Sequence, residues 1–346
     1  MPDSHRGLLS TNQPLVEAYD CAMLDLDGVV YVGPRAVEGV AQLLERARRL
    51  GMTLAFVTNN ASRTPDAVAA HLTELGIAAN ARDVVTSAQA AARELAARLD
   101  GGAKVLVIGG EGLRVALREQ GLTCVETIDE DPVAVVQGFD RSVGWEQLAQ
   151  GAYAVRAGAL WVAANLDLTV PTAGGIAPGN GTLVNAVAAA VDARPGVVAG
   201  KPYRPLFDET VRRIESQRPL VVGDRLDTDI EGANTCAADS LLVMTGVTDV
   251  RALCGARPEQ RPTYIARTLD GLFEAHGVPK RDGEVFALGG WQVAVRGDRL
   301  VAQQHGKDRG DALRAAASAA WAWYDEHQGD GGAPGLDGWD ADWLRP

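Results

Sequence analysis

An apolar run, residues 21–24, leads directly into Asp25, Asp27 and Gly28, and this junction limits the folds open to the chain. If the run is a β-strand, side chains two residues apart lie on one face, so the two carboxylates share a side. Open α/β sheets bind ligands at the carboxyl ends of parallel strands, and a glycine there suits a sharp turn or a close ligand. The junction predicts a strand end that carries chemistry, although an ordinary Asp-x-Asp-Gly turn has the same sequence.

The residues that follow alternate between helical and strand patterns. The spacing predicts a helix over 34–51, a buried strand over 52–57 and a helix over 65–75. Strands and helices that alternate in this way along the chain are typical of a parallel, doubly wound sheet. The pattern restarts near residue 84 and motifs typical of the first part resume near residue 199, so we expect an inserted α/β unit between them.

The last 70 or so residues differ in character from the rest. Short strands are predicted within 284–303 and a helix over 311–327. Five of the seven tryptophans fall in this part of the chain: Trp291, Trp321, Trp323, Trp339 and Trp343. This density indicates packing against either the remainder of the protein or a partner.

Charge and composition exclude several classes of protein. The net charge is −12, and the sequence has no stripe of basic residues that could neutralise phosphates. Both observations argue against nucleic acid as a partner. No apolar run is long enough to cross a bilayer, and the first 20 residues lack a signal-peptide pattern. Four cysteines without metal-type spacing indicate a reduced, cytoplasmic protein. We therefore expect neither membrane nor nucleic acid as a partner.

Two more aspartates follow another apolar strand pattern, later in the chain. Asp224 comes directly after residues 220–222, and Asp229 lies five residues further on. Carboxylates that converge with Asp25 without balancing bases provide the hard oxygen ligands that Mg²⁺ prefers. Without a cation, their repulsion would force at least one of them to hold a proton. Asp229 could instead be a helix cap.

Residues suited to phosphate binding occur at two other places. Thr58 ends the strand over 52–57 and is followed by Asn59 and Asn60, whose backbone N–H groups could bind phosphoryl oxygens together with the hydroxyl. Lys201 lies in a Gly-Lys-Pro loop, where its charge could neutralise a phosphate. An ordinary Asn-Asn turn and a surface lysine are the alternatives.

The order of these residues along the chain resembles the haloacid dehalogenase (HAD) superfamily of phosphotransferases. Its four motifs are matched by Asp25, Asp27, Thr58, Lys201, Asp224 and Asp229. The position of the inserted unit resembles the cap of subfamily IIA, the p-nitrophenylphosphatase and glycerol-3-phosphate phosphatase group. Segments 27–31, 58–63 and 178–181 also fit that group, as do Asn165 and Asp167.

The resemblance, which covers roughly residues 15–272, implies the domain organisation. It implies a doubly wound α/β core formed by residues 1–85 and 196–272, with an α/β cap formed by residues 86–195. Residues 273–346 would then be a small α+β extension. Tailed members of the group carry a partial acetyltransferase-type fold here, but the sequence shows no acetyl-CoA pyrophosphate loop, so that second activity is not expected.

The resemblance also implies roles for single residues. Asp25 would attack phosphorus, and Asp27 would act as general acid and base with a raised pKa. Mg²⁺ would be held by the Asp25 carboxylate, the Asp27 backbone carbonyl and Asp224, with Asp229 supporting them. Thr58 and Lys201 would complete the catalytic set by stabilising the phosphoryl oxygens. Substrate and phosphate would be bound by Gly28, Asn59, Asn60, Asn165 and Asp167.

The expected activity is Mg²⁺-dependent hydrolysis of a small phosphate monoester through an aspartyl-phosphate, with glycerol 3-phosphate as the favoured substrate. Phosphatases of 2-phosphoglycolate, pyridoxal phosphate or nucleotides are alternatives, as is a phosphomutase. The alternative from another class is an inactive HAD-fold binding protein. A partial dinucleotide pattern over 104–113 lacks the full Gly-x-Gly-x-x-Gly. The partner is then a small phosphate ester, and a homodimer is also compatible with the resemblance.

Overall fold

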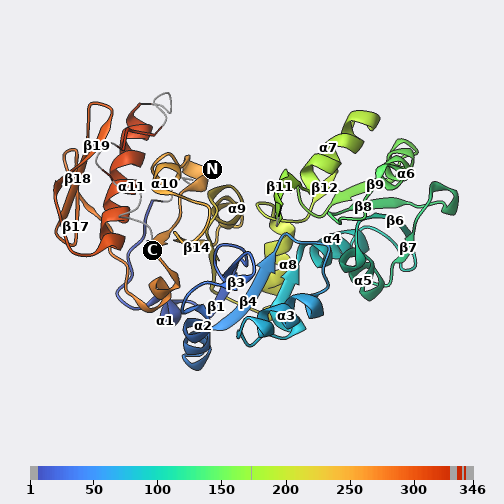
Figure 1. Ribbon diagram of the computed structural model, residues 1–346, viewed down its shortest axis with the longest axis horizontal. Coiled ribbons are helices and arrows are strands. Elements are labelled where there is room, and N and C mark those ends of the chain that lie inside the picture. The colour runs from blue at the N-terminus through green and yellow to red at the C-terminus, as the bar shows by residue number, and fades with distance from the viewer. Residues whose placement is uncertain (1–6, 173, 328–332, 337–338, 340–346) are drawn as a thin grey trace. The chain divides into compact units, whose positions relative to one another are not determined.

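The computed structural model describes residues 7–172, 174–327, 333–336 and 339. The chain divides into two compact units, Met1–Leu54 with Ser216–Pro346, and Ala55–Glu215. Helices alternate with strands of parallel sheets through most of the sequence (Figure 1), which confirms the predicted α/β class. Among these described residues, no helix is both long and apolar enough to cross a bilayer.

One sheet has six strands in the order β15-β14-β13-β1-β4-β5. Their bounds are β1 Cys21–Leu24, β4 Thr53–Thr58, β5 Val84–Thr86, β13 Pro219–Gly223, β14 Asp239–Val243 and β15 Tyr264–Ala266. β1 and β13 are parallel, with Leu24 opposite Val222. Every residue of β1 is buried, as expected of a parallel strand covered on both faces. This register brings the carboxyl ends of β1 and β13 to the same edge, where Asp25 and Asp224 follow.

The predicted helix over 34–51 is wrong in its first part. The helix α2 spans Val40–Arg49, and the residues before it form a small hairpin of β2, Tyr31–Val32, and β3, Arg35–Ala36. Gly33 has a φ of +57° in the two-residue turn between these strands, a conformation that such turns need and that other residues resist. The remaining helices of the first unit, apart from the C-terminal one, are α1 Leu15–Ala18, α9 Glu231–Thr235 and α10 Val250–Cys254.

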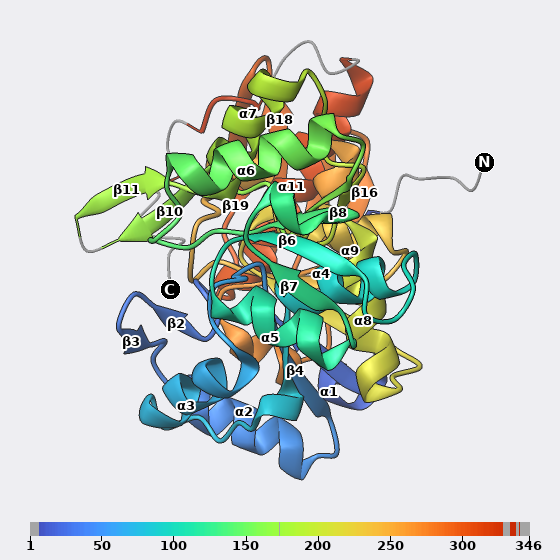
Figure 2. The ribbon, with the colours of Figure 1, turned by 90° about the vertical axis from the view of Figure 1, so that its right-hand side faces the viewer.

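A second parallel sheet lies in the second unit, with the order β12-β9-β8-β6-β7. Its strands are β6 Lys104–Ile108, β7 Thr123–Val125, β8 Ala134–Gln137, β9 Leu160–Ala163 and β12 Val197–Val198. The helices of this unit are α3 Pro65–Glu74, α4 Ser87–Ala96, α5 Glu111–Glu119, α6 Trp145–Arg156, α7 Asn180–Val191 and α8 Arg204–Ile214. A hairpin of β10 Thr169–Thr172 and β11 Gly175–Pro178, which the sequence analysis missed, is drawn in light green at the left of Figure 2.

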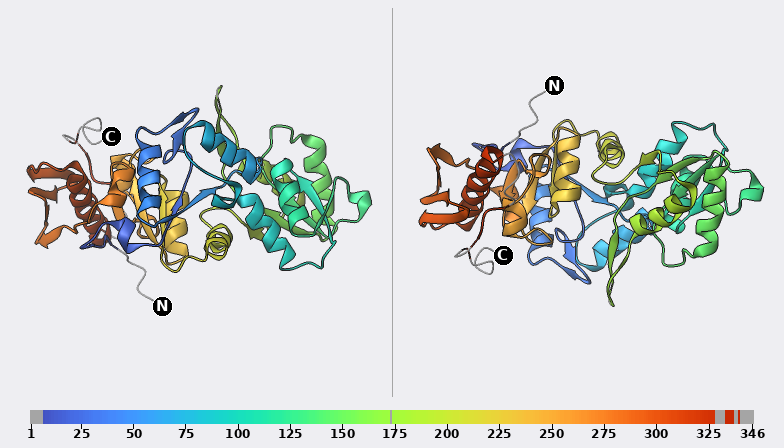
Figure 3. Two further views of the ribbon diagram at one scale, coloured as in Figure 1. Left: turned by 90° about the horizontal axis from the view of Figure 1, so that it is seen from below. Right: turned by 90° about the horizontal axis from the view of Figure 1, so that it is seen from above.

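The C-terminal part of the first unit is an antiparallel sheet with one long helix. The strands are β16 Lys280–Asp282, β17 Val285–Leu288, β18 Trp291–Arg296 and β19 Arg299–Gln304, and the helix is α11 Arg309–Glu326. Figure 3 shows the helix, in red, beside these strands. Trp291, Trp321 and Trp339 are buried in one apolar cluster that also contains Leu242 and Ile265 of the parallel sheet. These three tryptophans therefore pack against the protein itself; Trp323 is partly exposed, and Trp343 lies outside the described residues.

A buried histidine makes the first unit sensitive to acid. His276 is 1% exposed, and its Nε2 hydrogen-bonds to the Gly271 carbonyl oxygen at 2.8 Å. The pKa of His276 is lowered to about 4, mainly by burial; the Gly271 hydrogen bond opposes this lowering and the charge of Arg314 adds to it. The ring lies 5.1 Å from that of Tyr264. Protonation of the folded state is therefore unfavourable.

We expect the free energy of unfolding to decrease as the pH falls from about 6.5 to 4. In that window the unfolded chain binds a proton at His276 that the folded chain does not, and the loss for a shift of this size is about 3 kcal/mol. Urea unfolding at pH 7 and pH 4.5 measures it. The variant His276→Gln keeps a donor for the Gly271 carbonyl and should show a smaller decrease; an equal decrease in both proteins would contradict the assignment.

Candidate active site

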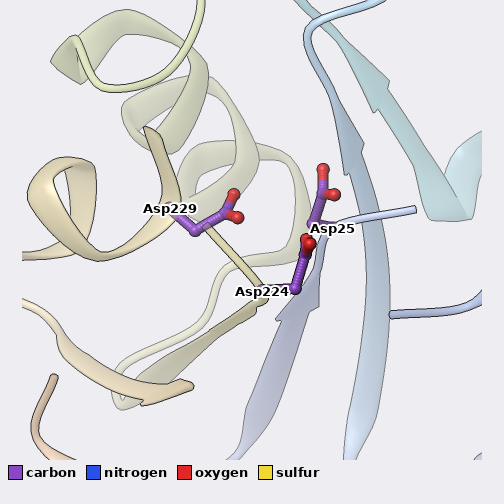
Figure 4. A group of neighbouring side chains, drawn as sticks. All are labelled: Asp25, Asp224 and Asp229. Carbon is purple, nitrogen blue, oxygen red and sulfur yellow. The ribbon is translucent and has the colours of Figure 1, made fainter. Parts of the chain in front are cut away.

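Three carboxylates converge at the edge of the sheet where β1 and β13 end. Asp25 follows β1, Asp224 follows β13, and Asp229 lies in a π-helical turn, Leu226–Ile230. One oxygen from each lies within 4.8 Å of the others, and Figure 4 shows the three side chains pointing toward a common space. Asp224 and Asp229 are buried, while Asp25 is partly exposed. The arrangement can therefore hold a cation and still admit a ligand from solvent.

The donor set fits a hard divalent cation such as Mg²⁺. All three groups offer carboxylate oxygens, with no histidine or cysteine among them, and Mg²⁺ selects oxygen ligands. Three carboxylates this close would otherwise repel one another in a partly buried site. A cation at this position would bring opposite charge to all three, so the chemistry of the cluster agrees with the predicted metal site.

Backbone groups fix the two buried carboxylates. The N–H of Val247 donates to Asp224 Oδ2 at 2.6 Å, and the N–H of Arg225 donates to Asp229 Oδ2 at 3.2 Å. Each of these backbone donors thus fixes the position of one carboxylate.

Glycines make room for these side chains. Gly28 has a φ of +85°, and a Cβ built on it, or on Gly246, would collide with the Asp224 carboxylate. A Cβ on Gly223 would collide with the Asp229 side chain. The Thr245 hydroxyl donates to the Gly28 carbonyl oxygen at 2.5 Å. Gly28, which was predicted to bind substrate, has a clear steric role beside Asp224; its contact with substrate stays a prediction.

Asp27 lies beyond the end of β1, in the loop that leads to the β2–β3 hairpin. Its side chain is exposed, whereas the intervening Leu26 is 1% exposed. The N–H of Gly28 donates to the Tyr31 carbonyl oxygen at 2.8 Å and closes this loop. Because the strand ends at Leu24, strand alternation does not explain the placement of Asp27. The tight loop places the Asp27 side chain in contact with solvent, and its role as general acid and base stays a prediction.

Apart from Gly28, the residues predicted to bind phosphate lie in the second unit. Thr58 is the last residue of β4, and its Oγ1 accepts a hydrogen bond from the N–H of Asn60 at 3.1 Å. The Asn60 side chain in turn accepts from the N–H and hydroxyl of Ser62 at 2.9 and 2.8 Å. Lys201 is 4% exposed, and its Nζ donates to the Val57 carbonyl oxygen at 3.3 Å. Lys201 therefore lies beside the strand end that carries Thr58.

Asn59 links three segments of this unit. Its Oδ1 accepts from the Lys201 N–H at 2.7 Å, and its Nδ2 donates to the Lys201 carbonyl oxygen at 3.1 Å. Nδ2 also lies 3.1 and 3.2 Å from the two carboxylate oxygens of Asp167. The Asn59 carbonyl oxygen accepts from Asn165 Nδ2 and Ser87 Oγ, both at 2.6 Å. The predicted residues Asn165 and Asp167 thus contact a residue of the predicted phosphate loop.

Three residues that contact the Asp224 side chain, the Gly28 backbone or the Asn59 backbone were not among the predicted site residues. Thr245 and Gly246 follow β14 as a short polar pair, and Ser87 is the first residue of α4. Thr245 and Gly246 could have been found from the sequence. A polar residue and a glycine after a buried strand indicate a strand end where the backbone comes close to another group, as at Asp27 and Gly28. Nothing in the local sequence distinguishes Ser87 from an ordinary residue at the start of a helix.

Comparisons with known proteins identify the class of protein. The family model for haloacid dehalogenase-like hydrolases matches residues 22–123, and a second model, described as HAD-hydrolase-like, matches residues 198–272. The chain belongs to the haloacid dehalogenase-like hydrolases, as the order of its strand-end residues predicted.

Particular relatives narrow the class. The chain is 44% identical to the D-glycerol 3-phosphate phosphatase of Mycobacterium tuberculosis, over 89% of this chain and 87% of that protein. The crystal structure of the glycerol phosphate phosphatase from that organism in complex with magnesium superposes with a TM-score of 0.81 at 45% identity, covering 90% of this chain and 92% of the other.

A shorter relative matches only part of the chain. The structure of p-nitrophenyl phosphatase from Archaeoglobus fulgidus has a TM-score of 0.68 at 27% identity. It covers 74% of this chain but 98% of its own. This likeness confirms the resemblance to the p-nitrophenylphosphatase group, and it shows that about a quarter of the present chain has no counterpart in that protein.

Proposed function

We propose that this chain is a Mg²⁺-dependent phosphatase that hydrolyses glycerol 3-phosphate to glycerol and phosphate. The observation that carries the proposal is the cluster of Asp25, Asp224 and Asp229 at the ends of neighbouring parallel strands. Its oxygen ligands suit Mg²⁺, and one carboxylate in it is accessible for attack. Support for the substrate comes from the mycobacterial relative, which is named for glycerol 3-phosphate and matches nearly the whole of both chains.

The proposed reaction has two displacements at phosphorus. An Asp25 oxygen attacks phosphorus and the ester P–O bond breaks, while Asp27 gives its proton to the leaving glycerol oxygen. Water then attacks phosphorus, Asp27 takes a proton from it, and the bond between phosphorus and Asp25 breaks to release phosphate. General acid–base catalysis of this kind contributes roughly 10²–10⁴-fold.

Other residues of the chain bind and orient the phosphoryl group. We assign Asp25 and Asp224 to holding Mg²⁺ with Asp229 supporting them, and the cation when bound would neutralise charge on the phosphoryl oxygens. The Asp27 carbonyl oxygen stays a predicted additional ligand. Thr58, the backbone of Asn59 and Lys201 are assigned to the phosphoryl oxygens, where most of the catalysis of phosphoryl transfer is electrostatic. Substrate binding by Asn60 stays a prediction.

We propose the division into a core, a cap and an extension with one revised boundary. The six-stranded sheet supports the core, and the parallel sheet of β6, β7, β8, β9 and β12 supports the cap. Because β12 pairs with β9, we place the end of the cap after Val198 instead of at residue 195. The antiparallel sheet and α11 support the extension, and the shorter p-nitrophenyl phosphatase is consistent with it.

The substrate is tested by comparing kcat/KM for glycerol 3-phosphate with that for propyl phosphate, 2-phosphoglycolate, pyridoxal phosphate, a nucleoside monophosphate and a sugar phosphate. A site that hydrogen-bonds the glycerol hydroxyls should reject propyl phosphate, which lacks them, by a factor of about 10⁴. The nucleotide and the sugar phosphate are included because curated relatives at 37% and 35% identity are named for these classes. A higher kcat/KM for any competitor would overturn the glycerol assignment and leave the phosphatase assignment in place.

Two further properties belong to the same proposal. We infer a homodimer and a cytoplasmic location from the resemblance to this enzyme group and from the reduced state expected of the four cysteines, two of which are buried. Sedimentation equilibrium at micromolar concentration tests the dimer, and a monomer there would refute it. Cell fractionation tests the location.

A further inference from the structure

We propose that Asp167 is a positioning residue: its carboxylate fixes the orientation of the Asn59 amide, and that amide holds the backbone of Lys201 so that the lysine meets the phosphoryl group in one geometry. The inference rests on the proposed function, in which Lys201 binds phosphoryl oxygens. It gives Asp167 a different task from the substrate binding that the sequence predicted.

The first step is the contact between Asn59 and Lys201. The Asn59 amide pairs with both backbone groups of Lys201, accepting at 2.7 Å and donating at 3.1 Å. One planar side chain thus binds the N–H and the C=O of a single residue in a loop. Gly200 permits this approach, because a Cβ there would lie 2.5 Å from Asn59 Oδ1.

The second step is the direction of the amide. The oxygen and nitrogen ends of an asparagine amide have almost the same shape, so only its partners determine which end points where. An ionised carboxylate only accepts hydrogen bonds. The N–H and C=O of Lys201 favour one orientation of the amide, and both oxygens of Asp167 lie next to Nδ2 and favour the same one. The acidic group therefore reinforces the orientation in which the amide holds Lys201.

Asp167 is itself held in place. Its backbone N–H donates to Asn165 Oδ1 at 3.1 Å, and Asn165 Nδ2 donates to the Asn59 carbonyl oxygen at 2.6 Å. Asn180, at the start of α7, donates from Nδ2 to the Asn165 carbonyl oxygen at 2.7 Å. Two asparagines therefore fix the segment that carries the carboxylate, and they connect it to α7.

The third step is the effect on the lysine side chain. Lys201 has a flexible four-carbon stem, and ordering such a side chain costs conformational entropy. Its Nζ is directed at the end of β4 by the hydrogen bond to the Val57 carbonyl oxygen at 3.3 Å. When the Lys201 backbone is fixed, its side chain loses part of the conformational freedom that would let the ammonium group move away from the end of β4. A displacement of about 1 Å in such a group can reduce the rate about 10²-fold.

The test compares the wild-type protein with Asp167→Asn, Asn59→Asp and the double variant, using glycerol 3-phosphate and p-nitrophenyl phosphate. Asp167→Asn keeps the shape but replaces the charged, acceptor-only group beside Nδ2 with a neutral amide that can also present a donor there, so we expect kcat to fall at least tenfold with both substrates. The inhibition constant of inorganic phosphate should rise by a similar factor. The double variant exchanges donor and acceptor, and should be more active than the product of the two single effects predicts.

The matched control is Asp83→Asn. Asp83 accepts from Asn80 Nδ2 at 2.8 Å in the same unit, so this variant changes the same kind of Asn–Asp contact at an exposed site. It should leave kcat for both substrates and the phosphate inhibition constant unchanged. Circular dichroism and the thermal midpoint check that each variant is folded; should Asp167→Asn fail to fold, Asp167→Glu, which keeps the acceptor-only group, should fold and retain more activity than Asn59→Asp.

The two substrates separate the outcomes. A loss confined to glycerol 3-phosphate would show that Asp167 contacts the glycerol moiety and would overturn the positioning role. Unchanged kcat and phosphate inhibition would also overturn it. A wild-type protein that hydrolyses neither ester would refute the proposed function instead. In that case, weaker binding of inorganic phosphate to Asp167→Asn than to wild type, measured by calorimetry with Mg²⁺, would still support the positioning role, and equal binding would overturn it.

Discussion

Replacing Asp25 with asparagine should abolish phosphatase activity while the protein stays folded. The neutral amide cannot attack phosphorus as the carboxylate does, and it weakens the cluster that Asp25 forms with Asp224 and Asp229. Loss of the covalent nucleophile of a serine protease costs roughly 10⁶-fold in kcat, so we expect at least a 10⁴-fold decrease. Initial rates with p-nitrophenyl phosphate and Mg²⁺ measure it.

The thermal midpoint separates lost chemistry from lost structure. Without Mg²⁺, Asp25→Asn removes one of three repelling carboxylates, so its midpoint should be no lower than that of the wild type. With Mg²⁺, the wild type should gain more stability than the variant, because a ligand that binds the folded state stabilises it in proportion to its affinity.

Asp227→Asn provides the matched control for Asp25→Asn. Asp227 is an exposed aspartate near the same sheet edge, in an ion pair with Arg225, and its replacement should change the rate by less than about twofold. Substantial activity in Asp25→Asn would contradict the covalent mechanism.

Removing the chain after Phe273 should have the largest effect on stability. Trp291 and Trp321 are buried in one cluster with Leu242 and Ile265. The Arg314 side chain also donates to the Ile265 carbonyl oxygen at 3.1 Å. Truncation would expose this apolar face and leave the carbonyl without that donor. We expect insoluble or aggregated protein, measured as soluble yield and elution volume.

Point substitutions provide a graded form of the truncation experiment. Trp321 is 4% exposed, and its Nε1 donates to the Leu253 carbonyl oxygen at 2.8 Å. Trp321→Ala should lower the free energy of unfolding by about 3–5 kcal/mol. Trp145, on α6, is 78% exposed, so Trp145→Ala should change it by less than about 0.5 kcal/mol. A truncated protein with the wild-type melting curve and elution volume would show that the extension is an independent module.

The parts of the site that local sequence determines could be predicted. Asp25 and Asp224 each follow a short run of buried residues, and parallel strands bring such ends to one edge, so their convergence follows from the strand pattern alone. The place of Thr58 at the end of β4 follows in the same way. The apolar periodicity also indicated the α/β class, the inserted unit and the different character of the tail.

The parts that depend on distant contacts could not be predicted. Asn59 contacts Asp167 and Lys201, which are 108 and 142 residues away along the chain, and no local pattern encodes such pairs. The helix predicted over 34–51 was given too early a start, and this error arises from local backbone conformation and not from distant contacts. Pro34 and the apolar residues after it suit a helix, but the positive φ of Gly33 and Gly39 favours a hairpin and a later start.

The pairing of β1 with β13 has a consequence for synthesis on the ribosome. Leu24 pairs with Val222, 198 residues later by subtraction. At about 5–20 residues per second, translation leaves the fully apolar β1 without this neighbour for roughly 10–40 s. The strands of the second sheet, from β6 to β12, are made within that interval. We therefore expect the nascent chain to complete the inserted sheet first and to need protection of β1 by a chaperone until β13 emerges.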